Sequence, residues 1–219
     1  MSNHAHKLEF WSLTAVLLIL LGMEWGGLFN GLNSWVNSTL PHGGFLVNLL
    51  TDTASLTASL LYILFFFAWD FKKRGRMSRF TLDLSLGFVL SMVLVAILKV
   101  SFATPRPGEV SVSWTLLERV KNLDYFSFPS GHTAKASIFA YFLSRRWKKL
   151  WPLWGGWAVS IALSRLLLHV HWFGDVLFSL LLGSWVGMLV VLTEDWWLPY
   201  YRAIVNALKL GVFDVEWSP

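Results

Sequence analysis

The chain has 219 residues, of which 55% are hydrophobic and only 14% are charged, and its mean hydropathy is +0.55. This composition excludes a water-soluble domain, which needs a larger share of charged side chains on its surface. The net charge of +5 does not indicate nucleic-acid binding, because the basic residues cluster in short segments rather than on one face. The absence of Cys excludes disulfides and thiolate chemistry. The sequence therefore predicts an integral membrane protein that forms a single domain over residues 1–219, with many of its 14 Trp and 17 Phe at the membrane interfaces.

Six apolar segments predict an all-α bundle of six membrane-spanning helices. In chain order, these helices are expected at about 8–29, 45–69, 80–100, 130–144, 152–168 and 172–193. The first is expected to remain as an uncleaved helix, because no small-x-small cleavage site follows its apolar run. The preceding residues Met1–Lys7 are expected to be a mobile lead, since His4 and His6 alone would make a poor metal site.

The basic residues indicate which helix ends face the cytoplasm, because loops rich in Lys and Arg stay inside. One cluster follows the second segment and another follows the fourth: Lys72, Lys73, Arg74, Arg76 and Arg79, then Arg145, Arg146, Lys148 and Lys149. The segment Asn30–Gly44 has no Lys or Arg and is expected to be an outer loop. These assignments predict a multi-pass protein of the cell membrane with both termini in the cytoplasm. The tail to Pro219 is expected to lie along the cytoplasmic interface, after an aromatic belt at 196–201.

A long connection, residues 101–129, joins the third and fourth segments on the outer side. Within it, Thr115 and Glu118 have the spacing of a capping box, and apolar residues follow at helical intervals. The pattern predicts a short amphipathic helix at the membrane interface. One hypothesis is that this connection acts as a lid.

The segment between the last two spans carries polar residues that a membrane helix does not need for folding. His171 and Asp175 are separated by one helical turn, so the carboxylate can bind one imidazole nitrogen and leave the other free. This is the pattern of a nucleophile or base with its orienting group. The predicted topology brings this segment to the same side of the membrane as the polar ends of the third, fourth and fifth spans.

Those neighbouring ends carry groups suited to a phosphoryl anion. Lys99, Arg106 and Arg165 supply three cations, and Arg106 is held between two prolines. Ser130 and Gly131 open a predicted helix, whose free N–H groups favour an anion.

His132 in the same helix could donate a proton to a leaving oxygen. The sequence offers no carboxylate cluster or HxxxH pair for a metal at this site, so charge stabilisation is expected from Lys and Arg. The pattern predicts phosphoryl transfer through a phosphohistidine.

Three motifs together resemble the signature of the type-2 phosphatidic acid phosphatase superfamily, in its membrane-integral lipid phosphatase branch. The motifs are Lys99-x6-Arg106-Pro107, Pro129-Ser130-Gly131-His132 and Ser164-Arg165-x5-His171-x3-Asp175. The resemblance implies a helical phosphatase that requires neither a metal nor another cofactor. It implies that His171 is the nucleophile, Asp175 its orienting partner and His132 the general acid. The residues implied to bind the phosphoryl oxygens are Lys99, Arg106, Ser130, Gly131 and Arg165.

The family resemblance also implies a lipid phosphate or diphosphate substrate, reached from the outer leaflet. A polyprenyl diphosphate is favoured because the chain has no additional domain for a large headgroup. Phosphatidic acid, phosphatidylglycerol phosphate and a lipid A phosphate remain alternatives. The other expected partners are membrane lipids, with no nucleic acid and no obligate protein partner.

Three other functions are compatible with parts of the pattern. A lipid phosphotransferase would use the same histidine. An anion-binding transporter could use the same cations, but it is expected to show repeats with broken helices, and none is evident. A vanadate-dependent haloperoxidase shares the motif set but is expected to be soluble.

Four further polar residues lie outside the three motifs. His169 is expected to pack, because a spacing of six residues does not place it beside Asp175 on a helix. Lys135 is expected either to approach the phosphate or to pair with an acid inside the membrane. Glu24 and Asp52 are candidates for interhelical pairing or for headgroup recognition.

Overall fold

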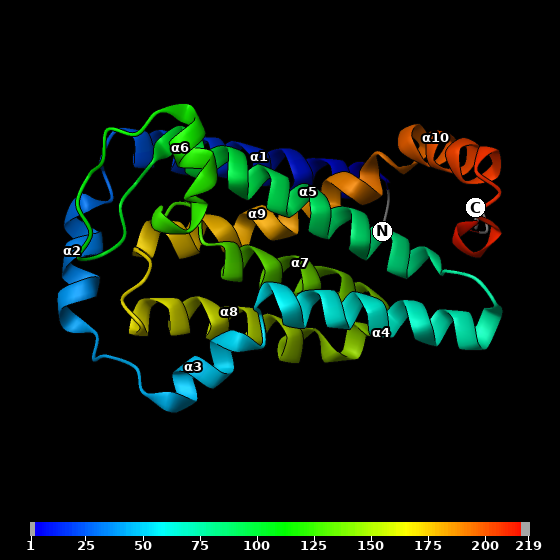
Figure 1. Cartoon of the computed structure of the whole chain (residues 1–219), viewed down its shortest axis with the longest axis horizontal. Helices are drawn as coiled ribbons and strands as arrows, with labels where there is room; N and C mark the ends of the chain where they lie inside the picture. Colours follow the sequence, from blue (N-terminus) through cyan, green and yellow to red (C-terminus); the bar gives the residue numbers. More distant parts are fainter. Residues whose placement is uncertain (1–2, 216–219) are drawn as a thin grey trace.

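The computed structural model describes residues 3–215 and is helical throughout, with no β-strand in that part of the chain (Figure 1). Its α-helices are α1 (Asn3–Trp25), α2 (Asn30–Thr39), α3 (Phe45–Asp52), α4 (Leu56–Arg74), α5 (Arg79–Phe102), α6 (Leu116–Lys121), α7 (Gly131–Arg146), α8 (Trp151–Leu167), α9 (Phe173–Leu192) and α10 (Glu194–Ala207). Three short 3-10 helices occupy Leu123–Tyr125, Lys148–Leu150 and Gly211–Phe213.

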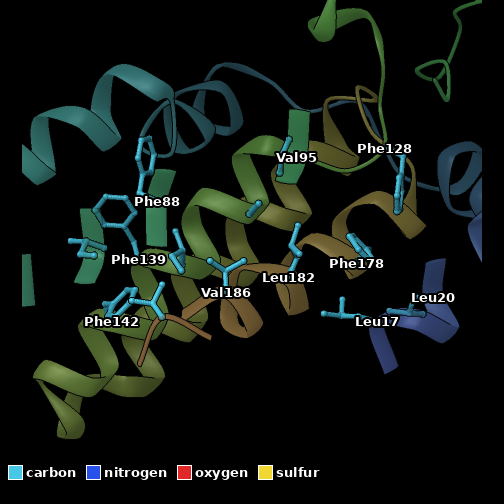
Figure 2. Close-up of a cluster of buried hydrophobic side chains, with 14 of the residues drawn as sticks. Leu17, Leu20, Phe88, Val95, Phe128, Phe139, Phe142, Phe178, Leu182 and Val186 are labelled. Atoms are coloured by element: carbon cyan, nitrogen blue, oxygen red, sulfur yellow. The ribbon is translucent and has the colours of Figure 1, made fainter. Parts of the chain in front are cut away.

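The long helices lie side by side, with α7 and α9 at the centre of the bundle (Figure 1). Helix α7 packs against α5, α8 and α9, and most of its side chains are buried. Figure 2 shows Phe139 and Phe142 of α7 close to Val186 of α9 and Phe88 of α5, all of them buried. Helices α2, α3 and α6 lie at one end of the bundle, and α10 lies at the other.

Three of the described helices are long and apolar enough to cross a membrane: His6–Trp25 within α1, α5 and α9. Helices α3 and α4 would together form a fourth span, with a bend of 43° between them. Many large apolar side chains point outward from these helices, including Leu18, Leu61 and Val93. Such surfaces require a lipid environment, so the prediction of a helical integral membrane protein is confirmed.

The predicted boundaries agree with the structure over the second half of the chain. Helices α5, α7, α8 and α9 begin and end within two residues of the predicted spans. The predicted interfacial helix is α6, and Thr115 and Glu118 form a reciprocal capping box at its start. Leu116, Leu117 and Val120 are exposed on α6, as expected for a helix that rests on a membrane.

The prediction was wrong about the first span and the loop after it. Helix α1 begins at Asn3 and ends at Trp25, and α2 replaces most of the loop that was expected at 30–44. The chain turns between α1 and α2 at Gly27, which has a φ of +68°. Tertiary contacts stabilise α2, because Asn33 Oδ1 accepts a hydrogen bond from Gly174 N at 3.0 Å.

The prediction of a mobile lead at the N-terminus was also wrong, because α1 already includes residues 3–7. No Gly or Pro interrupts the start of this helix. Met1 and Ser2 lie outside the described residues. Much of the predicted interfacial tail is helix α10, and residues 216–219 also lie outside the described part.

The single span predicted at 45–69 is divided into α3 and α4. Ser55 begins α4 as its N-cap, accepting a hydrogen bond from Ala58 N at 3.1 Å. Thr53 ends α3, and its hydroxyl oxygen accepts a hydrogen bond from Trp157 Nε1 of α8 at 3.0 Å. Polar residues that compete for backbone groups therefore interrupt the helix where an unbroken apolar pattern was expected.

The close approach of α7 and α9 depends on glycine. A Cβ atom at Gly183 would lie 2.5 Å from Ser137 Cβ and 2.7 Å from the carbonyl oxygen of Ala134. We expect Gly183→Ala to destabilise the protein by about 1–3 kcal/mol through overpacking, measured as a lower unfolding midpoint in detergent. Gly155→Ala in α8 is the matched control, because nothing lies within 4 Å of its Cβ position and no loss of stability is expected. Equal destabilisation by both changes would contradict this explanation.

Candidate active site

His171 and Asp175 form a buried hydrogen-bonded pair between the end of α8 and the first turn of α9. His171 Nδ1 and Asp175 Oδ2 are 3.1 Å apart, and the two residues are 3% and 0% exposed. A carboxylate can only accept, so Nδ1 is the donor and the neutral ring keeps a lone pair on Nε2. The structure contains the predicted hydrogen bond, and an imidazole with a free Nε2 lone pair could act as a nucleophile or base.

The local backbone explains how this pair is positioned. Helix α8 ends at Leu167, and His169 adopts the left-handed region with a φ of 50°, which turns the chain toward α9. Asp175 Oδ2 also accepts a hydrogen bond from Trp172 N at 2.8 Å, in the first turn of α9. One carboxylate therefore both caps the helix and orients the imidazole.

The predicted cations lie around His171. Burial lowers the pKa of His171 well below its ordinary value of 6.5, and the positive charges of Lys99, Arg165 and Arg106 lower it further. His132 acts in the same direction. The imidazole is therefore neutral near pH 7, as nucleophilic attack requires.

Lys99 and Arg165 are held by neighbouring elements. Lys99, in the last turn of α5, donates a hydrogen bond to the carbonyl oxygen of Phe126. Arg165, near the end of α8, donates from one terminal nitrogen to Thr51 Oγ1 at 3.1 Å. The Nε atoms of Arg165 and Arg106 are buried and have no hydrogen-bond partner among the described residues. Two guanidinium N–H groups thus remain able to bind an anion.

The segment that carries Arg106 is fixed to the start of α9. Trp172 Nε1 donates to the carbonyl oxygen of Pro105 at 2.8 Å, and Ser127 Oγ donates to the same oxygen at 3.2 Å. Pro105 also forms an isolated bridge with Phe126, the residue whose carbonyl holds Lys99. These contacts connect the first and third sequence motifs at one end of the bundle.

The second motif opens α7 as predicted. Ser130 is the N-cap, and its hydroxyl oxygen accepts from Thr133 N at 3.4 Å and from Thr133 Oγ1 at 3.0 Å. A Cβ atom at Gly131 would meet only Val95, at 3.8 Å, so protein packing does not require glycine there. Gly131 is the first residue of a 16-residue helix, and the free N–H groups at such a helix start favour an anion. His132 follows in the first turn and is only partly buried.

Comparison with known proteins agrees with this arrangement. Residues 80–198 match the PAP2 superfamily, over more than half of the chain and including all three motifs. The chain belongs to the PAP2 superfamily. The family resemblance predicted from the motifs is therefore confirmed.

Individual PAP2 proteins show similarity over different lengths. An undecaprenyl-diphosphatase of Sulfolobus acidocaldarius is 39% identical over 126 residues, which cover 56% of this chain and 58% of that protein. The chain thus matches little more than half the length of this relative. The structure of a transmembrane PAP2-type phosphatidylglycerolphosphate phosphatase from Bacillus subtilis aligns with a TM-score of 0.68 at 24% identity, covering 85% of this chain and 96% of that one. Aquifex aeolicus LpxE aligns with a TM-score of 0.53 at 27% identity, covering 74% and 93%.

The PAP2 motifs did not reveal the residues that support the site. Thr51 holds Arg165, but a threonine in an apolar segment gives no signal of such a role. Glu24 Oε1 accepts from Thr104 Oγ1 at 3.2 Å, and its other oxygen lies beside Gly174, where an added Cβ would be 3.2 Å away. Glu24 is thus placed near the pair formed by His171 and Asp175, and a carboxylate in an apolar helix was the signal that pointed to it.

The structure also shows the surroundings of three other polar residues, His169, Lys135 and Asp52. His169 packs as predicted, with Nδ1 2.9 Å from Asn37 Oδ1 and its ring stacked on His42. Lys135 is buried in α7 and forms no ion pair with Glu24 or the exposed Asp52 in the described structure.

Over residues 3–215, no group of three or more His, Cys, Asp or Glu side chains could hold a metal ion.

Proposed function

We propose that this chain is a metal-independent lipid phosphate or diphosphate phosphatase that forms a phosphohistidine at His171. The observation that carries the proposal is the His171–Asp175 pair surrounded by Lys99, Arg106 and Arg165. A nucleophile with a free Nε2 lone pair and a set of phosphate-binding cations is what phosphoryl transfer requires.

The reaction has two steps. Nε2 of His171 attacks phosphorus, the bond from phosphorus to the leaving oxygen breaks, and His132 donates a proton to that oxygen. Water then attacks the phosphohistidine and gives a proton to His132, releasing phosphate and restoring both histidines. Asp175 keeps the imidazole in the reactive tautomer and stabilises the positive charge that develops on it.

The transferred group is negatively charged in both steps. Arg106 and Arg165 present buried N–H groups without partners, and Lys99 adds a compact charge. Ser130, Gly131 and the start of α7 bind the remaining phosphoryl oxygens. These groups are preorganised around the reacting phosphorus, which is where electrostatic stabilisation is most effective.

We propose six membrane spans, one of which is formed by α3 and α4 together. Both termini then lie in the cytoplasm, and the active site lies at the extracytoplasmic face of the cell membrane. The distribution of basic residues supports this orientation. The basic turns between α4 and α5 and between α7 and α8 lie at the end of the bundle with α10, whereas α2 and α6 lie at the end with the active site (Figure 1).

Polyprenyl diphosphate is the proposed substrate, supported by the similarity to an undecaprenyl-diphosphatase. The test is phosphate release by the purified protein, with a chelator present, from a polyprenyl diphosphate, phosphatidic acid, phosphatidylglycerol phosphate and a lipid A phosphate. We expect chelator-resistant turnover that is fastest with the polyprenyl diphosphate. A requirement for divalent metal, or preference for another headgroup, would contradict the corresponding part of the proposal. Transfer of phosphate to an added acceptor lipid would instead identify a phosphotransferase, and binding without turnover a transporter.

The neutral state of His171 predicts the pH dependence of the first chemical step. Protonation removes the Nε2 lone pair, and burial holds the pKa of His171 well below 6.5. The rate of phosphoenzyme formation should therefore remain high as the pH falls past 6.5 and decline only at clearly lower pH. Single-turnover rates, corrected for the ionisation of the substrate, measure this. A decline centred at or above pH 6.5 would contradict the prediction.

A further inference from the structure

An apolar groove runs along the bundle between α4, α7 and α8. It has a volume of about 580 Å³ and is lined mainly by aromatic rings, including Tyr62, Phe139, Trp154 and Trp157. Thr53 is its main polar contact. The groove is large enough for a hydrocarbon chain, and its walls offer such a chain almost no polar group.

At the end remote from His171, this groove continues into a second cavity with a different lining. The two cavities share Phe65, Phe66 and Trp147 as lining residues. The second has a volume of about 760 Å³ and lies between the end of α4, the start of α5 and the end of α7. Four cations line it, namely Lys73, Arg74, Arg79 and Arg146. We call it the basic pocket.

The acids near the basic pocket are already engaged. Asp70, which lines it, accepts hydrogen bonds from Ser78 N at 3.0 Å and from Thr81 Oγ1, within the turn between α4 and α5. Asp83 and Glu194 both pair with Arg79, at 2.8 Å and 3.1 Å. Arg79 is therefore neutralised by its own partners.

The other three cations lack acidic partners. Lys73, Arg74 and Arg146 form no ion pair with any residue that the structure describes. Lys73 Nζ lies 4.8 Å from the ring centre of Trp69, and the Arg146 guanidinium lies 5.9 Å from that of Trp147. Both rings line the same pocket, so these contacts keep two of the uncompensated charges at its walls.

We propose that the groove and the basic pocket together bind one anionic phospholipid of the membrane. Its phosphate lies among Lys73, Arg74 and Arg146, and one acyl chain lies in the aromatic groove. A small anion would leave the groove unfilled, whereas a zwitterionic headgroup brings a positive charge toward three unpaired cations. The basic pocket lies at the ends of α4 and α7 and the start of α5, whereas the catalytic centre lies at the end of α5 and the starts of α7 and α9. The proposed phosphate site is therefore at the opposite end of the bundle from the catalytic centre (Figure 1).

The test is equilibrium binding of phosphatidylglycerol with brominated chains, followed by quenching of Trp fluorescence in the full-length protein in non-ionic detergent. Phosphatidylglycerol is a phosphodiester that the proposed phosphatase does not consume, so binding and turnover are read independently. Brominated phosphatidylcholine with the same chains is the neutral comparison. We expect phosphatidylglycerol to bind about tenfold more tightly, because several basic residues contribute to its recognition.

Lys73→Gln/Arg74→Gln removes two of the unpaired cations and is expected to weaken phosphatidylglycerol binding about tenfold, to the level of phosphatidylcholine. Lys148→Gln/Lys149→Gln is the matched control, because it removes the same charge from positions that are exposed, as Lys73 and Arg74 are, but that do not line the pocket. The control should bind like the unmodified protein, and equal unfolding midpoints verify that both variants fold. Equal binding of the two lipids, equal effects of the two double variants, or displacement by inorganic phosphate at matched ionic strength would overturn the proposal.

Discussion

Replacing His171 by Ala should lower the rate of phosphate release by about 10³-fold or more, because the nucleophile is lost. The cations and the start of α7 would remain, so substrate affinity should change much less than turnover. The measurement is steady-state phosphate release together with substrate binding by the purified variant. A variant that retains more than about a tenth of the activity would contradict the assignment of His171 as nucleophile.

His169→Asn is the matched control for this prediction. His169 is two residues away but contacts Asn37 and His42 instead of Asp175. Its φ of 50° is readily adopted by Asn, so the substitution should not strain the turn between α8 and α9. Activity should fall by no more than about threefold, because a substitution at a partly buried residue outside the reacting groups usually has a small effect.

Asp175→Asn should slow formation of the phosphoenzyme by about 10²–10⁴-fold while preserving the fold. Trp172 N and His171 Nδ1 both bond to Asp175 Oδ2, so one atom of the Asn amide must occupy that position. The amide oxygen there keeps both hydrogen bonds but lacks the negative charge that stabilises the positive imidazole of the phosphoenzyme. The NH₂ group there would lose the bond to Trp172 N and favour the His171 tautomer that has no lone pair on Nε2. Single-turnover phosphoenzyme formation and the unfolding midpoint together measure the two effects.

Asp70→Asn provides the comparison for Asp175→Asn. Asp70 is also a buried carboxylate that accepts a backbone N–H, from Ser78 at 3.0 Å, but it lies near the end of α4, where α4 connects to the start of α5. Activity is expected to remain within about threefold, because no reacting group contacts Asp70. A similar loss of activity in both variants would indicate a general effect of removing a buried charge and would contradict an orienting role for Asp175.

The sequence predicts α5, α7, α8 and α9 well because charged residues, Pro or turns bound each apolar run. It does not predict α2, whose position depends on the contact of Asn33 with Gly174, 141 residues later in the chain. The break between α3 and α4 likewise depends on Thr53 and its contact with Trp157. Hydrophobic periodicity contains no information about such distant contacts.

The candidate site likewise contains residues that the sequence identifies and residues that only tertiary contacts identify. Residues with chemistry of their own, such as His171 and Arg165, are recognisable from type and spacing. A residue that only supports the site is not recognisable in this way: Thr51 is identified by its contact with Arg165 at 3.1 Å, and Thr104 by its contact with Glu24 at 3.2 Å. Glu24 is intermediate, because a carboxylate inside an apolar segment indicates some role without identifying its partner.

The most direct test of a phosphohistidine at His171 is to trap the intermediate. The protein would be mixed with a lipid diphosphate carrying a radioactive terminal phosphate, quenched within one turnover, and digested to locate the label. We predict a label on the peptide that contains His171, stable in alkali, lost in acid, and absent from His171→Ala. A label on another residue, or turnover without any labelled intermediate on this timescale, would contradict the mechanism.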